Sequence, residues 1–209
     1  KGMKSIALGA VALTLVALTA PAAAADLSYA GSPYTVPEPL NGYSWAGPYL
    51  GGNLGYEWGS VTNNPTSPSG LTGGVEAGYN FESGSWVFGI EGDIDATGAD
   101  DTFAPWQFSN PWFGTVRGRA GYALSNILFY ATGGLAFGEL RGETFGGLSE
   151  SHTNVGWTAG LGAEFGLTQH WSAKIEYIFV DLAESPFAIT GVSNGYHFGT
   201  VRAGVNYHF

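Results

Sequence analysis

The sequence lacks three things that most proteins use: cysteine, abundant charge and long apolar runs. With no cysteine among 209 residues, disulfides, thiolate metal sites and a cysteine nucleophile are excluded. Charged residues make up 11% of the chain, against about 25% in an average soluble domain. After residue 25 no apolar run approaches the roughly 20 residues that a membrane-spanning helix needs. These absences exclude both an ordinary soluble globule and a helical membrane protein.

Positive charge is scarce as well. Seven Lys and Arg residues stand against 17 Asp and Glu, which gives a formal net charge of −10. Because binding to nucleic acid requires a basic surface, we expect no nucleic-acid partner. What the chain has instead is 34 glycines and an aromatic content of 15%. It is therefore apolar and aromatic without long apolar runs.

The first 25 residues are predicted to be a secretory signal peptide. Lys1 and Lys4 precede an apolar stretch from Ile6 to Thr19, which is too short to span a membrane as a helix. A basic start, a short apolar stretch and small residues before a cleavage point are the parts of an export signal. We expect cleavage after Ala25, with Ala24 as the alternative.

The rest of the chain divides in two. Residues 26–44 contain several prolines and are predicted to form an extended periplasmic tether. In residues 45–209, eight segments alternate apolar residues with small or polar ones, which is the period of a strand with one apolar face. In the second segment, for example, Val75 and Ala77 flank Glu76.

The composition of the two strand faces favours a membrane barrel over a soluble sandwich. The apolar faces carry no charged residue, and an Arg or Lys facing lipid at mid-bilayer would cost about 2–4 kcal/mol. In a soluble sandwich the polar face would be rich in Lys and Glu. Here it consists mainly of Gly, Thr and Asn with a few charges, as expected of a narrow polar interior.

The connections between the segments alternate in length. Short turns facing the periplasm, longer outer loops and an even number of strands are typical of outer-membrane barrels. We therefore predict an all-β fold, an eight-stranded antiparallel transmembrane β-barrel of the outer-membrane type. The short connections are 82–85, 124–126 and 166–170, and the longer ones are 59–70, 97–110, 139–152 and 183–195.

Aromatic residues gather at both ends of the segments. Tyr and Trp are enriched where a membrane meets water, so we predict two interfacial girdles. Packing in a soluble core would not produce two such bands. The tryptophans of the girdles are Trp58, Trp112 and Trp157 near the outer ends and Trp86 and Trp171 near the periplasmic ends.

Several motifs have the form of one protein family. They are Tyr49-Leu-Gly-Gly-Asn-Leu-Gly-Tyr56, Arg117-Gly-Arg-Ala-Gly-Tyr122, Tyr130-Ala-Thr-Gly-Gly-Leu-Ala-Phe-Gly138, Lys174-Ile-Glu-Tyr-Ile-Phe-Val-Asp181 and Val205-Asn-Tyr-His-Phe209. With these motifs the chain resembles the small outer-membrane β-barrel or "porin family" proteins of alphaproteobacteria. That family is related in architecture to opacity-type adhesins and the OmpA transmembrane barrel.

The resemblance has implications for fold, location and assembly. It implies an eight-stranded barrel in the outer membrane of a Gram-negative bacterium. It also implies that Phe209, with Tyr207 two residues before it, is a signal read by the outer-membrane assembly machinery. It does not by itself imply that solutes pass through the barrel.

Charged residues are expected to concentrate in the interior. Pairing Phe81 with Trp86 across the turn would set Glu76 opposite Glu91. Pairing Phe165 with Trp171 would set Lys174 opposite Gly162 and Glu176 opposite Gly160. Since the interior of an eight-stranded barrel is just wide enough for side chains to fill it, we predict a salt-bridge network across it. Its members are Glu76, Glu91, Asp93, Arg117, Arg119, Glu164, Lys174, Glu176 and Arg202.

The predicted function is structural and interactive. We expect the barrel to maintain the outer membrane and to present its outer loops to the surroundings, with a plugged interior. The alternative is a narrow porin-like channel for small solutes. The expected partners are outer-membrane lipids, lipopolysaccharide and the assembly machinery, and the sequence identifies no extracellular ligand.

No enzymatic activity, cofactor or metal site is predicted. Asp93, Asp95, Asp100 and Asp101 could offer oxygen ligands to Ca²⁺, but their spacing does not match an EF-hand loop, and solvated acids are the preferred interpretation. The segment 149–152 has the residue types of a nucleophilic triad. Adjacent residues rarely provide triad geometry, so a polar loop is preferred there.

Overall fold

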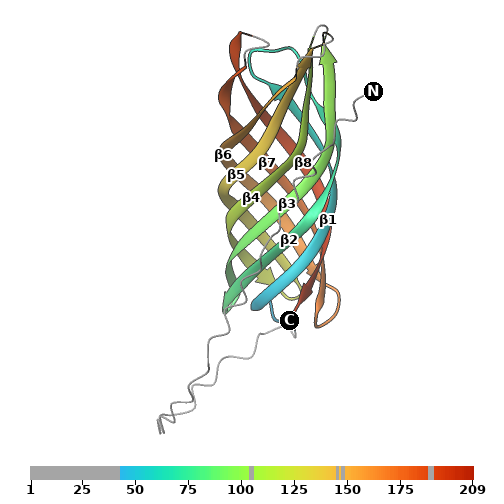
Figure 1. The fold of residues 1–209 in the computed structure, drawn as a ribbon. Coiled ribbons are helices and arrows are strands. Elements are labelled where there is room, and N and C mark those ends of the chain that lie inside the picture. Colours follow the sequence, from blue (N-terminus) through green and yellow to red (C-terminus); the bar gives the residue numbers. More distant parts are fainter. Residues whose placement is uncertain (1–42, 104–105, 145, 147–148, 188–190) are drawn as a thin grey trace, which may run out of the picture. The chain divides into compact units, whose positions relative to one another are not determined.

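The computed structural model describes residues 43–103, 106–144, 146, 149–187 and 191–209, all within one compact unit of the chain. It is a closed barrel of eight antiparallel strands, each paired with its neighbours in sequence, and β1 pairs with β8 to close the ring (Figure 1). This confirms the predicted fold class. The strands are β1 Gly47–Val61, β2 Ser69–Ser83, β3 Trp86–Phe103, β4 Trp106–Leu124, β5 Ile127–Thr144, β6 Ser149–Gly166, β7 Trp171–Phe187 and β8 Val192–His208.

Closure of the sheet gives the backbone amides and carbonyls of every strand a hydrogen-bonding neighbour. The strands run obliquely around the long axis of the barrel (Figure 1), as closure of a sheet into a barrel requires. Because the ring has no free edge, backbone amides and carbonyls along the ladders are paired within the barrel. Within the described ranges, no helix has the length and apolar character needed to cross a membrane.

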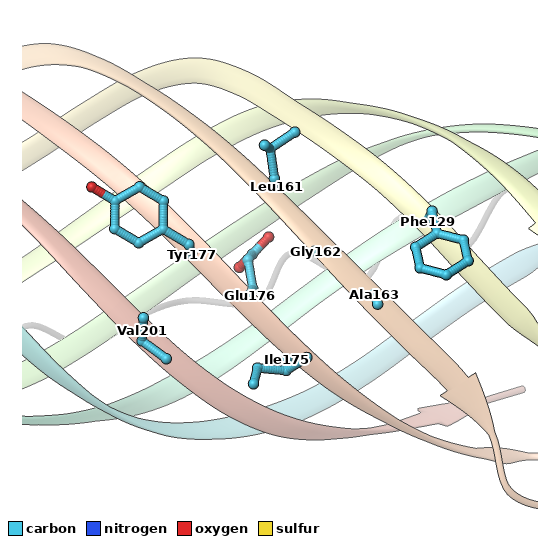
Figure 2. A pocket seen from close by; sticks show the side chains of 8 residues that line it. All are labelled: Phe129, Leu161, Gly162, Ala163, Ile175, Glu176, Tyr177 and Val201. Atoms are coloured by element: carbon cyan, nitrogen blue, oxygen red, sulfur yellow. The ribbon is translucent and has the colours of Figure 1, made fainter.

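The outward face is apolar. Leu54, Leu71 and Leu161 are 76%, 75% and 66% exposed, which would be costly in water over so wide a surface. Figure 2 shows part of this face, where apolar side chains including Phe129 and Ile175 border a shallow groove of about 360 Å³. The alternation in the sequence therefore corresponds to an apolar exterior and a polar interior.

Three short connections lie at one end of the barrel. They are 84–85, 125–126 and 167–170, and following the prediction we call this the periplasmic end and the opposite one the outer end. Gly84 and Ser125 occupy the left-handed region with φ of 62° and 59°. That conformation suits a tight hairpin turn, and Gly adopts it without a steric penalty.

The sequence predicts four long outer loops, and the predicted extent of these loops is wrong. Most of those residues continue the strands, since β1 runs to Val61, β3 to Phe103, β5 to Thr144 and β7 to Phe187. The prediction failed because alternation of apolar and polar residues reports contact with lipid. A strand that continues beyond the lipid has no reason to keep it.

Two predicted registers are also wrong, each by two residues. Trp86 pairs with Ser83, so Glu76 lies opposite Asp93 and not Glu91. In the β6–β7 hairpin, Phe165 pairs with Ala173, which sets Lys174 opposite Glu164 and Glu176 opposite Gly162. A shift by two residues keeps every side chain on its own face, so the alternation could not reveal the error.

Candidate functional site

Charged side chains fill the middle of the interior. We call this set the charged belt, and in it the structure brings together all nine residues of the predicted network and one more, Asp95. Its carboxylates come from β2, β3, β6 and β7, and its cations from β4, β7 and β8. The members are Glu76, Glu91, Asp93, Asp95, Arg117, Arg119, Glu164, Lys174, Glu176 and Arg202, all of them buried.

Arg117 connects opposite walls of the barrel. Its guanidinium pairs with Glu91 and, at 3.1 Å, with Asp93, both on β3. On the other side it reaches Glu176 of β7 at 3.0 Å. In a ring of eight strands β3 and β7 are diametrically opposed, so the side chain of Arg117 spans the interior.

Two further cations complete this part of the belt. Arg202 of β8 approaches Glu176 at 2.7 Å, Asp95 at 3.1 Å and Asp93 at 3.2 Å. Lys174 of β7 places its Nζ 2.6 Å from Glu76 and 3.3 Å from Glu91. Each of these cations therefore shares its carboxylates with a neighbour, which makes the belt a network and not a set of separate pairs.

Arg119 forms the periplasmic margin of the belt. It pairs with Glu164 of β6, and its guanidinium carbon lies 3.8 Å from the centre of the Tyr130 ring, within cation–π range. Glu164 also accepts hydrogen bonds from Ser172 at 2.5 Å and from the amide of Asn206 at 2.9 Å.

Glycine gives large inward side chains their room. A Cβ on Gly78 would collide with the ring of Tyr49, whose hydroxyl donates to Glu91 at 2.7 Å. A Cβ on Gly162 would collide with the ring of Tyr130 in the same way. Part of the high glycine content thus serves the interior, where two large side chains cannot face each other.

An aromatic cluster lies on the periplasmic side of the belt. We call it the periplasmic cluster, and its members are Tyr43, Trp45, Val87, Ala123, Leu128 and Tyr130. Trp45 is fully buried and its backbone N–H donates to Glu82 at 2.9 Å. Burial raises the pKa of the Tyr43 hydroxyl from its ordinary value of 10.0 to about 12, so this hydroxyl stays protonated at neutral pH.

Tyr43 and Trp45 are buried in the barrel mouth. This differs from the sequence prediction, which includes residue 43 in the tether and gives Trp45 no position in the interior. A signal was present, because both residues have the same parity as the inward-facing Tyr49 and Asn53 of β1. Continuing the alternation of β1 backwards would have predicted that their side chains point into the barrel mouth.

A larger apolar cluster lies in the interior on the outer side of the belt. We call it the outer cluster, and its members are Val61, Phe108, Phe113, Ala136, Leu140, Ile178, Val180, Leu182, Tyr196 and Phe198. The Phe113 and Phe198 rings lie 5.0 Å apart. Alternation alone did not predict it, since β7 is apolar on both faces here.

Backbone hydrogen bonds hold the connection between β1 and β2 against β1 and β8. The amide of Gly59 donates to the carbonyl of Pro68 at 3.0 Å, and that of Val61 to Thr66 at 3.1 Å. The amide of Thr62 donates to Gly195 at 2.9 Å, which ties the connection to β8. Thr66 and Pro68 are buried as a result.

Four of the five predicted girdle tryptophans lie on the outward face near the strand ends. Trp58, Trp86, Trp157 and Trp171 are about half exposed and contact aromatic neighbours, as Trp86 does with Tyr122 at 5.2 Å between ring centres. Trp112 differs. It is less exposed, lies at the register shift between Ser109 and Phe113, and its indole N–H donates to Glu139 at 3.1 Å.

The weaker candidate sites gain no support from the geometry. In the described part of the chain no three His, Asp or Glu side chains are grouped so as to hold a metal ion. Asp101 instead accepts a hydrogen bond from the Ser67 amide at 2.7 Å. Segment 149–152 lies in β6 and not in a loop, and alternation puts its serines on the face opposite His152, which contacts Glu150 at 2.9 Å.

The comparisons with known proteins agree with the architecture. The 31 kDa outer-membrane immunogenic protein of Brucella melitensis is 33% identical over 245 residues, covering 99% of this chain and 100% of the relative. The 22 kDa outer membrane protein of Rhizobium leguminosarum is 33% identical over 79% of each chain. These relatives support the predicted resemblance to alphaproteobacterial proteins.

Two solved structures share the fold. Neisserial surface protein A superimposes with a TM-score of 0.54 at 17% identity, covering 78% of this chain and 98% of that one. The attachment invasion locus protein of Yersinia pestis gives 0.51 at 17% identity, with 78% and 99% covered.

The family described as "Outer membrane protein beta-barrel domain" matches residues 10–209. With this match and relatives that are named outer-membrane proteins, the chain belongs to the outer-membrane β-barrel family, and its apolar outward face is the surface that meets the lipid of the outer membrane.

Proposed function

We propose that this protein is a structural and surface-interacting barrel whose interior is closed to solutes. One observation carries the proposal. Arg117 bridges opposite walls of the barrel, and its side chain and those of its partners Glu91, Asp93 and Glu176 are fully buried. A solute passing through would have to separate several of these ion pairs at once in a low-dielectric interior, where each broken pair leaves an uncompensated charge.

Two further features support closure. The periplasmic cluster and the outer cluster, both mainly apolar, lie on either side of the charged belt. An eight-stranded barrel is in general just wide enough for side chains to fill.

The experiment is single-channel recording in planar bilayers. We expect no resolvable conductance steps for the refolded wild type. Arg117→Ala serves as the opened variant and Arg141→Ala, which changes an exposed pair, as the matched control. We expect conductance steps in Arg117→Ala and none in Arg141→Ala. Steps in the wild-type recordings that vanish when the interior is blocked would refute closure.

A narrow cation path is the second candidate. An excess of carboxylates in the interior favours it, because a negatively lined pore attracts cations. The same recordings decide between the two, since this alternative requires cation-selective steps in the wild type.

The outer end is the proposed contact surface. The Brucella relatives are named immunogenic outer-membrane proteins, and this name supports exposure of the corresponding end here. The acidic net charge suits contact with lipopolysaccharide through bridging divalent cations better than direct attraction to its anionic groups. Antibodies against peptides of the outer end should label intact cells, and a deletion strain should show altered envelope permeability or adhesion; absence of both effects would contradict the role.

The assembly machinery is the proposed periplasmic-side partner. Phe209 is 71% exposed and its ring packs edge-on against Tyr207 at 5.1 Å. An exposed aromatic residue beside Tyr207 is accessible to a partner that recognises this segment. Phe209→Ser should reduce the amount of heat-modifiable barrel in the outer membrane of cells while leaving refolding of the purified chain in detergent unchanged.

A further inference from the structure

The outer third of the interior holds a carboxylate that no basic side chain accompanies. Glu57 of β1 is fully buried. Its Oε1 accepts hydrogen bonds from the Tyr196 hydroxyl at 3.1 Å and from the Asn110 amide at 3.3 Å. Its Oε2 has no hydrogen-bond partner, and among the described ion pairs none includes Glu57. Such a group differs from every carboxylate of the charged belt, each of which lies within 4.0 Å of a Lys or Arg nitrogen.

Other buried oxygen atoms without partners lie on the inward faces of β8 and β2, the strands that flank β1, and of β3. Thr200 is its ladder partner on β8. Thr72 of β2 faces inward next to Gly70, the ladder partner of Glu57 on that side. The hydroxyls of Thr72 and Thr200 have no hydrogen-bond partner, although these residues are only 3% and 0% exposed. Buried polar groups are rarely left in this state, so these oxygens indicate a missing partner.

Asp95 extends the group on β3. Thr97 is the ladder partner of Thr72, and Asp95 is the next inward residue on the same strand. One carboxylate oxygen of Asp95 accepts from Arg202 at 3.1 Å, whereas Oδ1 has no partner and Asp95 is fully buried. We call Glu57, Thr72, Asp95 and Thr200 the outer oxygen cluster.

The balance of buried basic and acidic side chains also indicates that a positive charge is missing from the interior. In the described part of the barrel four basic side chains are buried, Arg117, Arg119, Lys174 and Arg202. The buried carboxylates number seven, because Glu57 joins the six of the charged belt, Glu76, Glu91, Asp93, Asp95, Glu164 and Glu176. An ionised carboxylate in an apolar environment is strongly unfavourable unless a positive charge accompanies it. A cation near Glu57 would supply both the missing charge and the missing partners.

We propose that the outer oxygen cluster binds a hard metal cation. Carboxylate and hydroxyl oxygens from a flexible cage are the ligands that such cations take, and calcium in particular accepts many of them. The site would hold the β8, β1, β2 and β3 walls together beneath the outer cluster. It requires no passage of ions through the barrel, so it is independent of whether the interior is closed.

The test measures stability against the identity of the cation. The refolded wild-type barrel, freed of metal with a chelator, is heated in detergent in chlorides of Na⁺, K⁺, Ca²⁺ or N-methylglucamine at equal ionic strength. Loss of the fast-migrating form on gels gives the midpoint of unfolding. We expect a metal present at a hundredfold above its Kd to raise the midpoint by roughly 5–10 °C over N-methylglucamine. The separate salts distinguish a monovalent from a divalent occupant.

Substitutions test whether the metal dependence of the unfolding midpoint arises at the outer oxygen cluster. Glu57→Gln keeps the shape of the side chain and should abolish the dependence on the metal, whereas Glu184→Gln, an exposed acid of β7, should retain it. The pair Thr72→Val and Thr200→Val removes two neutral ligands without changing charge, and it should shift the metal titration to at least tenfold higher concentration. This second variant keeps the proposal testable if Glu57→Gln fails to fold.

Two results would overturn the proposal. Equal midpoints of the wild type in all four salts would mean that a proton, and not a metal, neutralises Glu57. A metal dependence that survives unchanged in Glu57→Gln and in the double Thr variant would place the ion elsewhere.

Discussion

The charged belt and the outer cluster fill the same interior by opposite means. In the belt, Arg117 and its partners are held by ion pairs that cross from wall to wall. In the outer cluster, Ile178, Phe113 and Phe198 are held by apolar contacts. The side chains of both regions are buried, but substitutions in them have different consequences. Removing a belt residue leaves a buried charge behind, whereas removing an apolar group leaves only a small void.

The largest expected effect comes from Arg117→Met, which breaks the belt at its centre. Glu91, Asp93 and Glu176 would lose a shared cation, and we expect the free energy of unfolding to fall by about 3–5 kcal/mol. Urea unfolding in lipid vesicles, followed by tryptophan fluorescence, measures it. In a background carrying Glu176→Gln the same substitution should cost less, because fewer buried charges remain unpaired. A loss below 1 kcal/mol would mean that the belt is no more important than a surface pair.

The next effect concerns the periplasmic cluster, which lies on the other side of the belt. Trp45→Ala removes a fully buried indole and should lower the free energy of unfolding by about 3 kcal/mol. It should also leave Glu82 accessible by loosening the backbone hydrogen bond from residue 45. Trp45→Phe, which keeps an aromatic ring, is the control and should retain most of the stability. If Trp45→Ala unfolds like the wild type, the segment before β1 makes no energetic contribution to the barrel.

A smaller effect is expected from Ile178→Val in the outer cluster. It deletes one methylene at a fully buried position, which costs about 0.5–1.5 kcal/mol where no charge is left behind. The outward-facing Ile175→Val, with its side chain 54% exposed to the membrane side, is the matched control and should cost less. Equal losses at the two positions would show that lipid packs against the barrel as tightly as the cluster packs within it.

The smallest effect is expected at Arg141, the basic side chain that pairs with Glu143 at 2.8 Å near the outer end. Both side chains are nearly half exposed, 49% and 42%. An exposed ion pair contributes about 0.2–1 kcal/mol and is screened by salt. Arg141→Ala should therefore change the unfolding midpoint only slightly, and less still in 1 M NaCl. A loss comparable to that of Arg117→Met would contradict the distinction between buried and exposed pairs.

Some features of the interior were predictable from sequence and others were not. That Arg117, Lys174 and Glu176 point inward follows from their parity on strands with an apolar outer face. Which carboxylate meets which cation does not follow, because it depends on register, and the two-residue turn at Gly84–Ser85 places Glu76 opposite Asp93. Contacts across the ring, such as Lys174 with Glu76, involve strands far apart in the sequence.

The positions of Trp112 and Glu57 also show that alternation in the sequence does not predict which side chains meet. Trp112 was assigned to the outer girdle from its place near a strand end, but the register shift beside it lets its indole reach Glu139. Glu57 lies on the polar face of β1, where its parity with Asn53 puts it. Its lack of a cation could be recognised only once Tyr196, Asn110 and Thr200 were placed around it.

By itself, the sequence determined the membrane class, the number of strands and the face on which the charged side chains of the belt lie. It did so through local quantities, namely the scarcity of charge and an alternation with a period of two residues. The tertiary structure decided the register, the length of the strands, the pairing across the belt and the apolar clusters on either side of it. These depend on contacts between residues distant in sequence, and a shift of two residues leaves the local pattern unchanged.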